Sequence, residues 1–468
     1  MTSSKSSAAT LSVVILAAGE GKRMKSRLPK VLQPLAGRPL LAHVIATARR
    51  LSPEAIYVVY GHGGERVREA LASEPVTWIE QPERLGTGHA VLQAMPRIAD
   101  AHRVLVLYGD VPLLGAATLE RLVALAGERE LALLTMQPED PAGYGRIIRG
   151  PGGRVARIVE QKDAAADEIA IRECNTGVLA APARLLKSWL AGLRNDNRQR
   201  EYYLTDIVAM AVAQGVAVEP LPLADAIEAL GVNDRAQLAT LEAECRRRAA
   251  YELMLGGVTV ADPARLDVRG RVIHGTDVSL DVNVVLEGQV RLGDRVRIGP
   301  GCVLRDCQIG DDSEVLAYCV LEGAIVGAAA RIGPYSRVRP ATTLGDGVHI
   351  GNFVEVKNST LAAESKANHL SYVGDAAVGE RVNIGAGTIV ANYDGANKHR
   401  TVIENDVHTG SNSVLVAPIT VGQGATVAAG STVAHEVPAG KLTIARARQT
   451  TLEGWQRPVK QRQQKKKK

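Results

Sequence analysis

The fold of the C-terminal half is decided by residues 326–356, which read VGAAARIGPYSRVRPATTLGDGVHIGNFVEV. Every sixth position is aliphatic, and the series is Val326, Ile332, Val338, Leu344, Ile350 and Val356. A helix repeats its apolar face about every 3.6 residues and a strand about every 2, so neither alone has this period. The repeat predicts a parallel β-helix of hexapeptides, in which the aliphatic residue points into the coil and three hexads close one turn.

The six-residue spacing continues on both sides of this stretch. It recurs at Leu292, Ile298 and Leu304, at Val378, Ile384 and Val390, and at Leu415, Val421, Val427 and Val433. The count fails between Val356 and Val378, and again after Val390. Because stacked coils cannot absorb extra residues, we expect both interruptions, 358–377 and 392–398, to be extruded as loops that share one polar site.

Composition bounds the whole chain and its partners. With 468 residues and 46% hydrophobic content, the chain is long enough for two or three globular domains. Six positive charges at Lys460, Arg462 and residues 465–468 account for the net charge of +6. We therefore expect residues 451–468 to be a solvated basic tail, and with only 3% aromatic residues we expect no nucleic-acid partner.

Cysteine usage and hydropathy point to a cytoplasmic protein. The five cysteines, Cys174, Cys245, Cys302, Cys307 and Cys319, have no spacing typical of zinc or redox motifs, which favours free thiols in a reducing compartment. Residues 1–10 are predicted to be disordered. The apolar run at 11–18 is too short to span a bilayer and is interpreted as a first strand, so no membrane partner is expected.

That first strand, residues 12–16, passes directly into the loop AAGEGKRM at 17–24. A glycine-containing loop after a strand of an open sheet can present backbone N–H groups to phosphates. The loop lacks the Gly-Lys-Ser/Thr ending of a P-loop and the third glycine of a dinucleotide fingerprint, so both of those interpretations fail. A plain tight turn remains the alternative.

Other polar segments favour a nucleotide site. Lys30 follows the loop, residues 85–88 form a second polar loop, and Asp110 ends a buried strand at 104–107. A carboxylate at that end of a strand could hold Mg²⁺ beside phosphates, although it could instead cap a helix before Pro112. Elements alternating through 118–126, 131–136 and 154–159 predict a mainly parallel sheet covered by helices, and a linker helix is predicted at 234–257.

The motifs LAAGEGKRM (16–24), LPK (28–30), LGTG (85–88), YGD (108–110), GYGR (143–146), NTG (175–177) and GVN (231–233), with Glu160, resemble those of sugar-nucleotide pyrophosphorylases. Over nearly the whole chain the sequence is similar to the bacterial family that joins an N-acetylglucosamine-1-phosphate uridylyltransferase to a glucosamine-1-phosphate acetyltransferase. The resemblance implies a Rossmann-like α/β nucleotidyltransferase domain at 11–233, then a left-handed parallel β-helix acetyltransferase domain at 258–450.

For the first domain, the resemblance implies that UTP and the sugar are bound by Leu16, Ala17, Ala18, Gly19, Arg23, Lys30, Gln81, Gly86, Thr87, Tyr108, Gly109, Asp110, Gly145, Glu160, Asn175 and Asn233. Asp110 and Asn233 would coordinate Mg²⁺. The step needs no protein nucleophile, because the sugar phosphate attacks the α-phosphorus of UTP and the protein aligns the reactants and stabilises charge.

For the second domain, the resemblance assigns His369 as the base that takes a proton from the sugar amine. A lone loop histidine is more often inert, but an imidazole with a reference pKa of about 6.5 suits this task, and many polar residues surround this one in the sequence. Glucosamine 1-phosphate would contact Arg339, Lys357, Tyr372 and Asn383. Acetyl-CoA would contact Ala386, Asn392, Tyr393, Ser411, Ala429 and Arg446.

Hexapeptide helices of this family are homotrimers with acyl sites between chains, and we expect the same here. One departure from the family pattern, Ala341 after Pro340, falls beside assigned residues rather than on them. Two alternatives stay open: a nucleotidyltransferase whose β-helix only assembles the protein, and a non-catalytic scaffold. His369 and the loop at 392–398 argue against the first, and Lys30, Asp110 and Asn233 argue against the second.

Overall fold

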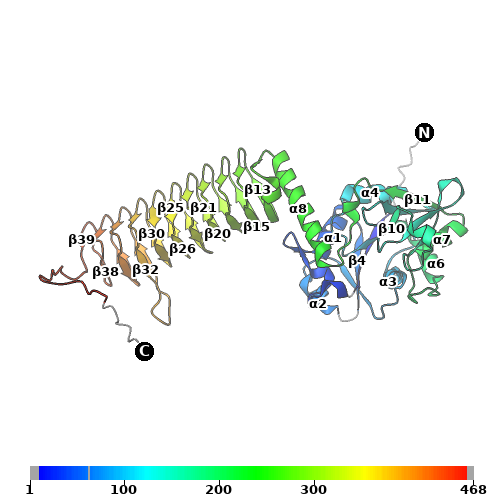
Figure 1. The fold of residues 1–468 in the computed structure, drawn as a ribbon, viewed down its shortest axis with the longest axis horizontal. Coiled ribbons are helices and arrows are strands. Elements are labelled where there is room, and N and C mark those ends of the chain that lie inside the picture. The colour runs from blue at the N-terminus through cyan, green and yellow to red at the C-terminus, as the bar shows by residue number, and fades with distance from the viewer. Residues whose placement is uncertain (1–9, 20, 62–63, 461–468) are drawn as a thin grey trace, which may run out of the picture. The chain divides into compact units, whose positions relative to one another are not determined.

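The computed structural model describes residues 10–19, 21–61 and 64–460; the predicted disordered residues 1–9 and the tail residues 461–468 lie outside this part of the chain. The chain divides into two compact units between Ala249 and Ala250 (Figure 1). The division falls inside helix α8 (Arg235–Leu255).

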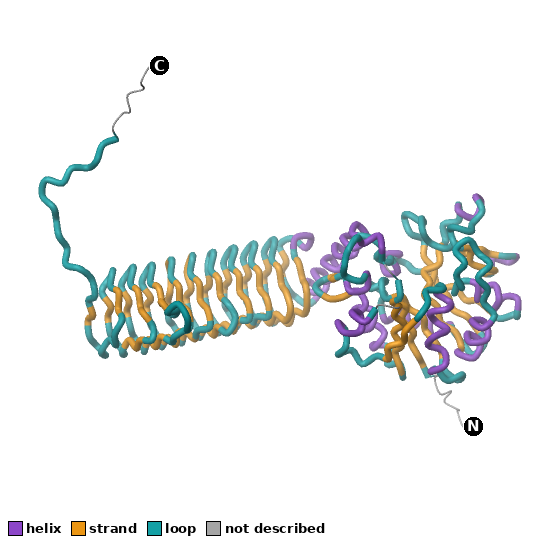
Figure 2. The backbone as a smooth tube through the Cα atoms, turned by 90° about the horizontal axis from the view of Figure 1, so that it is seen from below, coloured by secondary structure: helices purple, strands orange, loops and turns teal. Residues whose placement is uncertain are grey.

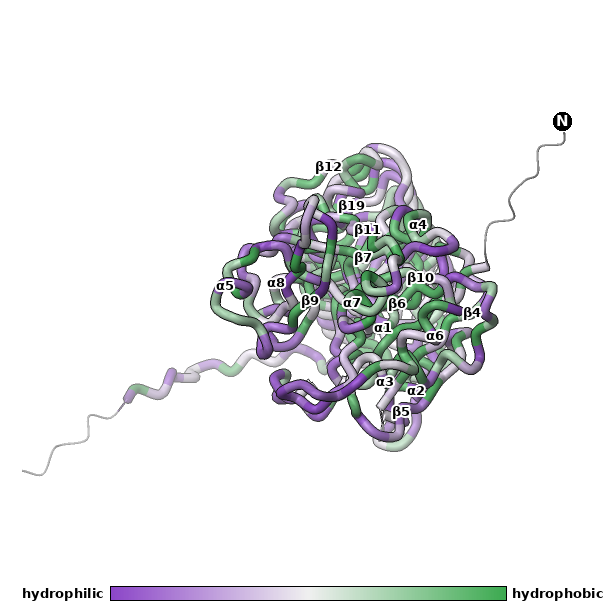
Figure 3. The backbone as a smooth tube through the Cα atoms, turned by 90° about the vertical axis from the view of Figure 1, so that its right-hand side faces the viewer, coloured by the Kyte–Doolittle hydropathy of each residue, from purple (hydrophilic) through white to green (hydrophobic). Residues whose placement is uncertain are grey.

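The first unit is an α/β domain. Its main sheet has the strand order β11-β7-β10-β6-β1-β4-β5, with β8 and β9 attached beside β10. The bounds are β1 (Leu11–Ala17), β4 (Ala55–Gly61), β5 (Thr77–Gln81), β6 (Arg103–Tyr108), β7 (Glu130–Met136), β8 (Arg146–Arg149), β9 (Val155–Val159), β10 (Cys174–Pro182) and β11 (Ala217–Pro222), with β2 (Pro34–Leu35) and β3 (Arg38–Pro39) as a separate pair. Figure 3 shows the central strands β6, β7 and β10 as hydrophobic, as expected for strands buried on both faces.

The main path of this sheet is mostly parallel, as expected from sequence, with β10 as its one antiparallel strand. Strands β4 and β6 pair in parallel with β1, but β10 runs antiparallel between β6 and β7. The reason is the antiparallel hairpin β8–β9, which returns the chain in the opposite direction before β10 begins. A strand-helix alternation in sequence does not reveal such a reversal.

Helices cover both faces of this sheet and enclose two apolar clusters. They are α1 (Leu40–Arg50), α2 (Glu65–Ala70), α3 (Thr87–Ala94), α4 (Ala116–Leu125), α5 (Ala166–Ile169), α6 (Ala183–Ala191) and α7 (Asp206–Ala213). Short 3-10 turns lie at η1 (Lys22–Met24), η2 (Lys30–Leu32), η3 (Met95–Arg97), η4 (Pro151–Gly153), η5 (Ala226–Ala229) and, in the second unit, η6 (Pro263–Arg265). Within the described residues no helix is long and apolar enough to cross a membrane.

The second unit is a parallel β-helix, as the six-residue period predicts, and its stacked coils are visible in Figure 2. One face, here called the first face, consists of β12 (Thr259–Val260), β14 (Ser279–Leu280), β16 (Arg297–Ile298), β19 (Glu314–Val315), β22 (Arg331–Ile332), β25 (His349–Asn352), β28 (Lys366–His369), β31 (Asn383–Ile384), β34 (His408–Thr409), β37 (Thr426–Val427) and β39 (Leu442–Thr443).

The remaining strands form the other two faces. They are β13 (Asp267–His274), β15 (Val285–Leu292), β17 (Val303–Arg305), β18 (Gln308–Ile309), β20 (Val320–Glu322), β21 (Ala324–Val326), β23 (Arg337–Val338), β24 (Thr342–Leu344), β26 (Glu355–Lys357), β27 (Thr360–Leu361), β29 (Tyr372–Gly374), β30 (Ala376–Val378), β32 (Ile389–Ala391), β33 (Thr401–Ile403), β35 (Val414–Val416), β36 (Ile419–Val421) and β38 (Thr432–Val433).

The aliphatic repeat forms the core of this unit. All six residues of the opening series, from Val326 to Val356, are at most 3% exposed. Residues that are in register in neighbouring coils are 17 or 18 apart, as in Glu314 beside Arg331 and Arg331 beside His349. Three hexads therefore close one turn, with an occasional five-residue step at a corner. This architecture fits the left-handed β-helix expected from the sequence.

The two interruptions of the period differ in kind, and one prediction was wrong. Residues 358–377 are not extruded: Leu361, Ala367 and Val373 are buried, and β27 to β30 pair in register with the coils before them. Two five-residue steps, rather than an insertion, shift the count. The chain then closes its turns without any loop in this segment.

The second interruption is a true insertion. Asn383 and His408 are in register although 25 residues separate them, because the chain leaves the coil after β32 and returns at β33. A bridge between Tyr393 and Lys398 closes this excursion, which protrudes beside β32 in Figure 1. Residues 392–398 therefore form a loop, as predicted.

Candidate functional site

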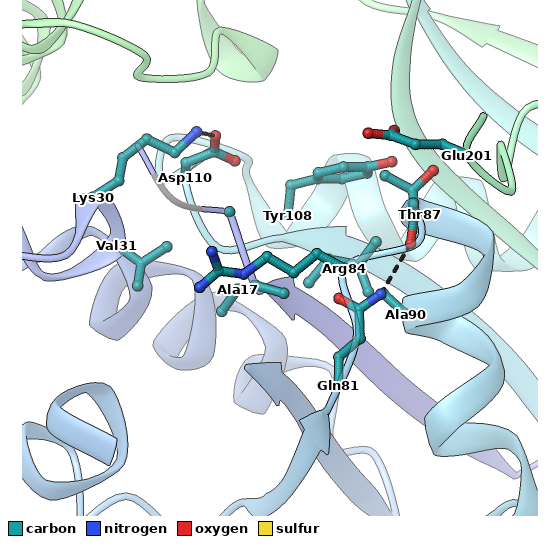
Figure 4. A pocket seen from close by; sticks show the side chains of 14 residues that line it. Ala17, Lys30, Val31, Gln81, Arg84, Thr87, Ala90, Tyr108, Asp110 and Glu201 are labelled. Carbon is teal, nitrogen blue, oxygen red and sulfur yellow. Dashed lines mark hydrogen bonds and ion pairs between the residues drawn. The ribbon is translucent and has the colours of Figure 1, made fainter. Parts of the chain in front are cut away.

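A cavity of about 560 Å³ opens in the first unit, beside the carboxyl ends of β1 and β6 (Figure 4). Its lining includes ten residues assigned from sequence: Leu16, Ala17, Ala18, Gly19, Lys30, Gln81, Gly86, Thr87, Tyr108 and Asp110. It also includes Val31, Arg84, Ala90 and Glu201, which the sequence analysis did not identify. Ligand sites of open α/β sheets are expected at this edge of the sheet.

The glycine loop holds Lys30 close to the end of β1. Gly21 has a positive φ of 64°, and a Cβ there would lie 2.6 Å from Cβ of Lys30. Only glycine tolerates both the conformation and this approach. The loop therefore does more than turn the chain, because it positions a lysine over the cavity.

Lys30 joins the two predicted metal ligands. Its Nζ forms an ion pair with Asp110 and donates a hydrogen bond of 3.3 Å to Oδ1 of Asn233. A carboxylate and an amide oxygen thus converge on one cation, and hard oxygen donors of this kind suit Mg²⁺, which usually takes few protein ligands and completes its shell with phosphate and water. Among the described residues, no group of three or more His, Cys, Asp or Glu could hold a metal ion.

The second loop of the cavity is held at its base by hydrogen bonds. The buried side chain of Gln81 donates to the carbonyl oxygen of Gly86 over 3.1 Å (Figure 4). Gly86 has φ 108°, and a Cβ there would lie 2.7 Å from the carbonyl oxygen of Tyr202. The next residue, Thr87, accepts a hydrogen bond of 3.1 Å from the backbone of Leu204.

The residues expected to hold the sugar gather around Tyr108. Its ring lies so close to Gly177 that a Cβ there would approach it to 2.5 Å, and burial followed by the charges of Glu160 and Asp110 raises the pKa of its hydroxyl. Gly145 and Glu160 are neighbours, since a Cβ on Gly145 would lie 3.5 Å from Oε2 of Glu160. The backbone N–H of Asn175 donates to the carbonyl oxygen of Gly145 over 2.8 Å.

Burial also raises the pKa of Glu160 itself, against the effect of a 3.0 Å hydrogen bond from the hydroxyl of Thr205.

Two assigned residues do not line the cavity. Arg23 is exposed on η1 and does not line the cavity. Gly109 lies behind it, where a Cβ would meet the carbonyl oxygen of Leu16 at 3.3 Å.

In the second unit, His369 lies at the end of strand β28 on the first face, not in a loop as the broken period had suggested. A line of backbone hydrogen bonds runs through it along the edge of this face. Leu370 donates to Asn352, Gly387 to His369, Asn412 to Ala386 and Gly430 to Ser411, over 2.7 to 3.1 Å. The guanidinium of Arg446 donates to the carbonyl oxygen of Ala429 over 2.6 Å.

This line, defined by residues 352, 369, 386, 411 and 429, joins the predicted base to three of the residues assigned to acetyl-CoA, and a fourth, Arg446, contacts its last member. Successive members lie one coil apart, which is about 4.8 Å. A long, narrow ligand can therefore lie along the edge with its reactive end at His369.

A second polar group lies around the insertion loop, on the face that follows. Asn392 donates to Asp375 and, over 3.4 Å, to the hydroxyl of Tyr372. Contact with Lys357 lowers the pKa of Lys398, so two ammonium groups face each other there. Two facing cations of this kind suit a phosphate, and the sequence analysis did not identify Lys398.

The remaining assigned residues are more dispersed. Arg339 pairs with Glu355 at 2.8 Å, and Tyr393 is 60% exposed on the insertion loop. Asn383 belongs to β31 on the first face, whereas Tyr372 belongs to β29 on another face. A single chain therefore presents the predicted sugar-phosphate residues on two different sides of its coils.

Comparison with known proteins relates both units to enzyme families. The model of the MobA-like NTP transferase domain matches residues 13–202, and that of the GMPPB C-terminal domain matches residues 268–349 and 328–439. A nucleotidyl transferase from Methanothermobacter thermautotroptrophicus is similar in structure with a TM-score of 0.39 and 20% identity, over 51% of this chain and 99% of that one.

Relatives named bifunctional protein GlmU match over nearly the full length. The protein from Azoarcus sp. (strain BH72) is 58% identical, over 97% of this chain and 100% of the relative. Those from Aromatoleum aromaticum and Ralstonia nicotianae are also 58% identical, over 97% of this chain and 99% of each relative. The family resemblance seen in the sequence is thus confirmed, and the chain belongs to the GlmU family of bifunctional enzymes, which carry the uridylyltransferase and acetyltransferase activities of UDP-N-acetylglucosamine biosynthesis.

Proposed function

We propose that the cavity of the first unit is the uridylyltransferase site and that the line through His369 is the acetyltransferase site. The assignment rests on one observation: the two groups of polar residues belong to different units of the chain. One gathers Lys30, Asp110 and Asn233 at a cavity of the first unit, and the other runs along a strand edge of the β-helix. The enzyme acetylates glucosamine 1-phosphate and then couples the product to UTP, releasing pyrophosphate.

In the cavity, UTP and N-acetylglucosamine 1-phosphate are held at opposite ends. Backbone groups of Leu16 to Gly19, with Gln81 and Thr87, bind the uridine, and Lys30 faces the triphosphate. Asp110 and Asn233 would hold Mg²⁺, which neutralises phosphate charge when bound. The sugar is oriented by Gly145, Glu160 and Asn175, so that its phosphate oxygen lies in line with the α-phosphorus and pyrophosphate departs toward Lys30.

Arg84 adds a second cation to this cavity. Figure 4 shows its guanidinium directed across the mouth toward Ala17 and Val31, on the same side as Lys30. A triphosphate carries several negative charges, so a second cation at the mouth strengthens its binding. Glu201 lies at the other end, near Thr87, where a sugar or ribose hydroxyl can donate to its carboxylate.

On the β-helix, His369 accepts the proton of the sugar amine as that amine attacks the acetyl carbonyl. The new bond is C–N, the C–S bond breaks, and the departing thiolate of CoA takes up a proton. Lys357, Lys398 and Arg339 hold the sugar phosphate, with Tyr372 and Asn383 against the sugar. Ala386, Ser411, Ala429 and Arg446 extend the line for the CoA chain, and Asn392 and Tyr393 border it from the insertion loop.

The acetyltransferase is proposed to act as a homotrimer. The sugar-phosphate residues lie on two faces of one chain, so a neighbouring copy is needed to bring both sets to one substrate. Beside the line, Tyr318, Tyr335 and Phe353 form an exposed ladder of stacked rings, with centroids 5.3 and 5.5 Å apart. Such exposed aromatic surface is typical of protein interfaces.

A cytoplasmic location is proposed from the thiols. All five cysteines are free, and four of them are buried. Unpaired cysteines in this number fit a reducing compartment. The substrates are small molecules, and the charge pattern favours neither nucleic acid nor membrane as a partner.

Reciprocal substitutions test the two assignments. Asp110→Ala should lower UTP-dependent pyrophosphate release by roughly 10²–10³-fold and leave acetyl-CoA consumption intact. His369→Ala should do the reverse, with a loss of roughly 10²–10⁴-fold. Full acetyl transfer by His369→Ala would refute the second site, and loss of both activities in either variant would refute the independence of the two.

A further inference from the structure

Two strands of the first face are longer than their neighbours, and they meet at His369. Strands β25 and β28 have four residues each, whereas the other described strands of this face have two. The extra length extends the pairing by Asn352 opposite His369. Gly351 makes this possible, because a Cβ there would lie 2.0 Å from the carbonyl oxygen of Asn368.

The extension aligns two side chains as well as two backbones. Oδ1 of Asn352 lies 3.0 Å from Nδ1 of His369. An amide oxygen can only accept a hydrogen bond, so Nδ1 must carry the proton. In a neutral imidazole the lone pair is then on Nε2, for which we find no hydrogen-bond partner among the described residues.

We propose that Asn352 is a positioning residue of the acetyl transfer: it fixes the tautomer and the ring orientation of His369, so that Nε2 is the atom that accepts the proton of the amine. The inference rests on the proposed base role of His369 and deepens it. Without this hydrogen bond the imidazole is shared between two tautomers and can rotate about χ2, so that only part of the population is ready to accept a proton.

The surroundings of His369 do not replace this contact. His349 lies on the same strand as Asn352, and Lys366 precedes His369 on β28. The next strand, β31, contributes the uncharged Asn383 opposite Lys366. These groups are cationic or neutral, so none offers an acceptor with negative charge to Nδ1. His349, Lys366 and Asn383 are unchanged in every Asn352 variant, so they do not account for differences in activity among those variants.

Three variants of the full-length enzyme separate positioning from mere structure. Asn352→Ala should lower kcat of acetyl transfer roughly 10-fold or more, less than the loss of the base itself, with little change in KM for either substrate. Asn352→Asp, of the same shape, should keep most of the activity at high pH. Its carboxylate stabilises the imidazolium, so the rising limb of the pH–rate profile should move to higher pH by about one unit. Asn352→Leu should behave like Asn352→Ala.

Two controls complete the experiment. Asn405→Ala removes an amide oxygen that accepts the backbone N–H of Glu380 in another coil, and it should leave the pH–rate profile in place. Uridylyl transfer by the same molecules reports on the integrity of the chain and should not change. In the His369→Ala background, Asn352→Ala should cost nothing further, because the group on which it acts is gone.

The outcomes distinguish the base role of His369 from the positioning role of Asn352. If His369→Ala retains acetyl transfer, the base assignment itself fails. If His369→Ala is inactive but Asn352→Asp leaves the pH limb where it was, or Asn352→Ala keeps full kcat, the base stands and the positioning role is overturned. A loss in Asn352→Ala that appears only as a raised KM would likewise overturn it.

Discussion

The two proposed sites of this enzyme are built by opposite means. In the α/β unit, Lys30 meets partners 80 and 203 residues away in the sequence, and Lys30 and Asp110 line a cavity within one chain. On the β-helix, each residue of the line meets a residue of the next coil, and the result is an open edge. Long-range contacts thus give a site within one chain, whereas stacked repeats give a long surface that a neighbour would cover in the proposed trimer.

Mixing two kinds of inactive chain tests whether the acetyltransferase site is shared between copies. Recovery of activity from inactive chains is the largest effect that we expect. Tyr372→Ala and Asn383→Ala should each be nearly inactive in acetyl transfer, because each lacks one of the proposed sugar contacts. When the two are co-expressed, about a quarter of the sites should pair an intact Tyr372 with an intact Asn383 from another copy and recover activity. Acetyl transfer would be measured on the purified mixture.

The cavity provides the matched control for this mixing. Lys30→Ala and Asp110→Ala inactivate one site within one chain, so their mixture should recover no uridylyl transfer. Recovery there, or no recovery in the β-helix pair, would contradict the difference between a site within one chain and a site shared between chains.

Glycine substitutions test how tightly the cavity is closed. Gly86→Ala places a Cβ 2.7 Å from the carbonyl oxygen of Tyr202 at a φ of 108°, so the loop must move away from Gln81. We expect a cost of about 1–3 kcal/mol and reduced uridylyl transfer with unchanged acetyl transfer. Gly152→Ala is the control: its φ is 72°, but nothing lies within 4 Å of its Cβ. Equal melting temperatures for the two variants would argue against a closed loop.

A smaller effect concerns Glu160 and pH. Because burial raises its pKa in the folded state above the ordinary value of 4.5, the folded chain holds the proton more tightly than the unfolded chain. The associated stability is present below that value and is lost as the pH rises through the folded pKa. Glu160→Gln should therefore reduce the loss of folding stability with rising pH. It should also raise the melting temperature of the first unit at neutral pH.

The measurement is thermal unfolding of the full chain between acid and neutral pH, with sugar binding followed in parallel. Glu160→Gln keeps an acceptor for the hydroxyl of Thr205 but loses the charge that faces the sugar, so its affinity should fall. The exposed Glu128→Gln should leave both quantities unchanged. A melting temperature that falls in Glu160→Gln at neutral pH would contradict the argument.

The coil architecture was predictable from sequence because each six-residue repeat corresponds to one side of a coil. The prediction of a loop at residues 358–377 was wrong, because a five-residue step and an insertion both interrupt the six-residue spacing. Only the burial of Leu361 and Val373 in the structure distinguishes the two. The antiparallel β10 was missed for a similar reason, because strand direction depends on a hairpin whose residues have no special pattern.

The candidate sites show the same limit. Glycine loops and strand-end carboxylates are local signals, so Lys30 and Asp110 were predictable from sequence. Arg84 directly precedes the predicted loop at 85–88 but belongs to no motif, and Glu201 lies far from the other lining residues in the sequence. The role of Lys398 is indicated only by its contact with Lys357. Arg23 carried a family signal yet does not line the cavity, because η1 directs it to solvent.

The stacking of the coils also bears on how the two units fold. Paired strands of the β-helix lie only one turn apart, as in Lys366 and Asn383, so a new coil can form on the preceding one as soon as about 17 further residues are available. The α/β sheet must wait longer, because β11 at residues 217–222 completes a sheet that begins at Leu11. Low contact order favours rapid, stepwise growth. During synthesis, the C-terminal unit can thus fold in order as it emerges, whereas the N-terminal unit folds only as a whole.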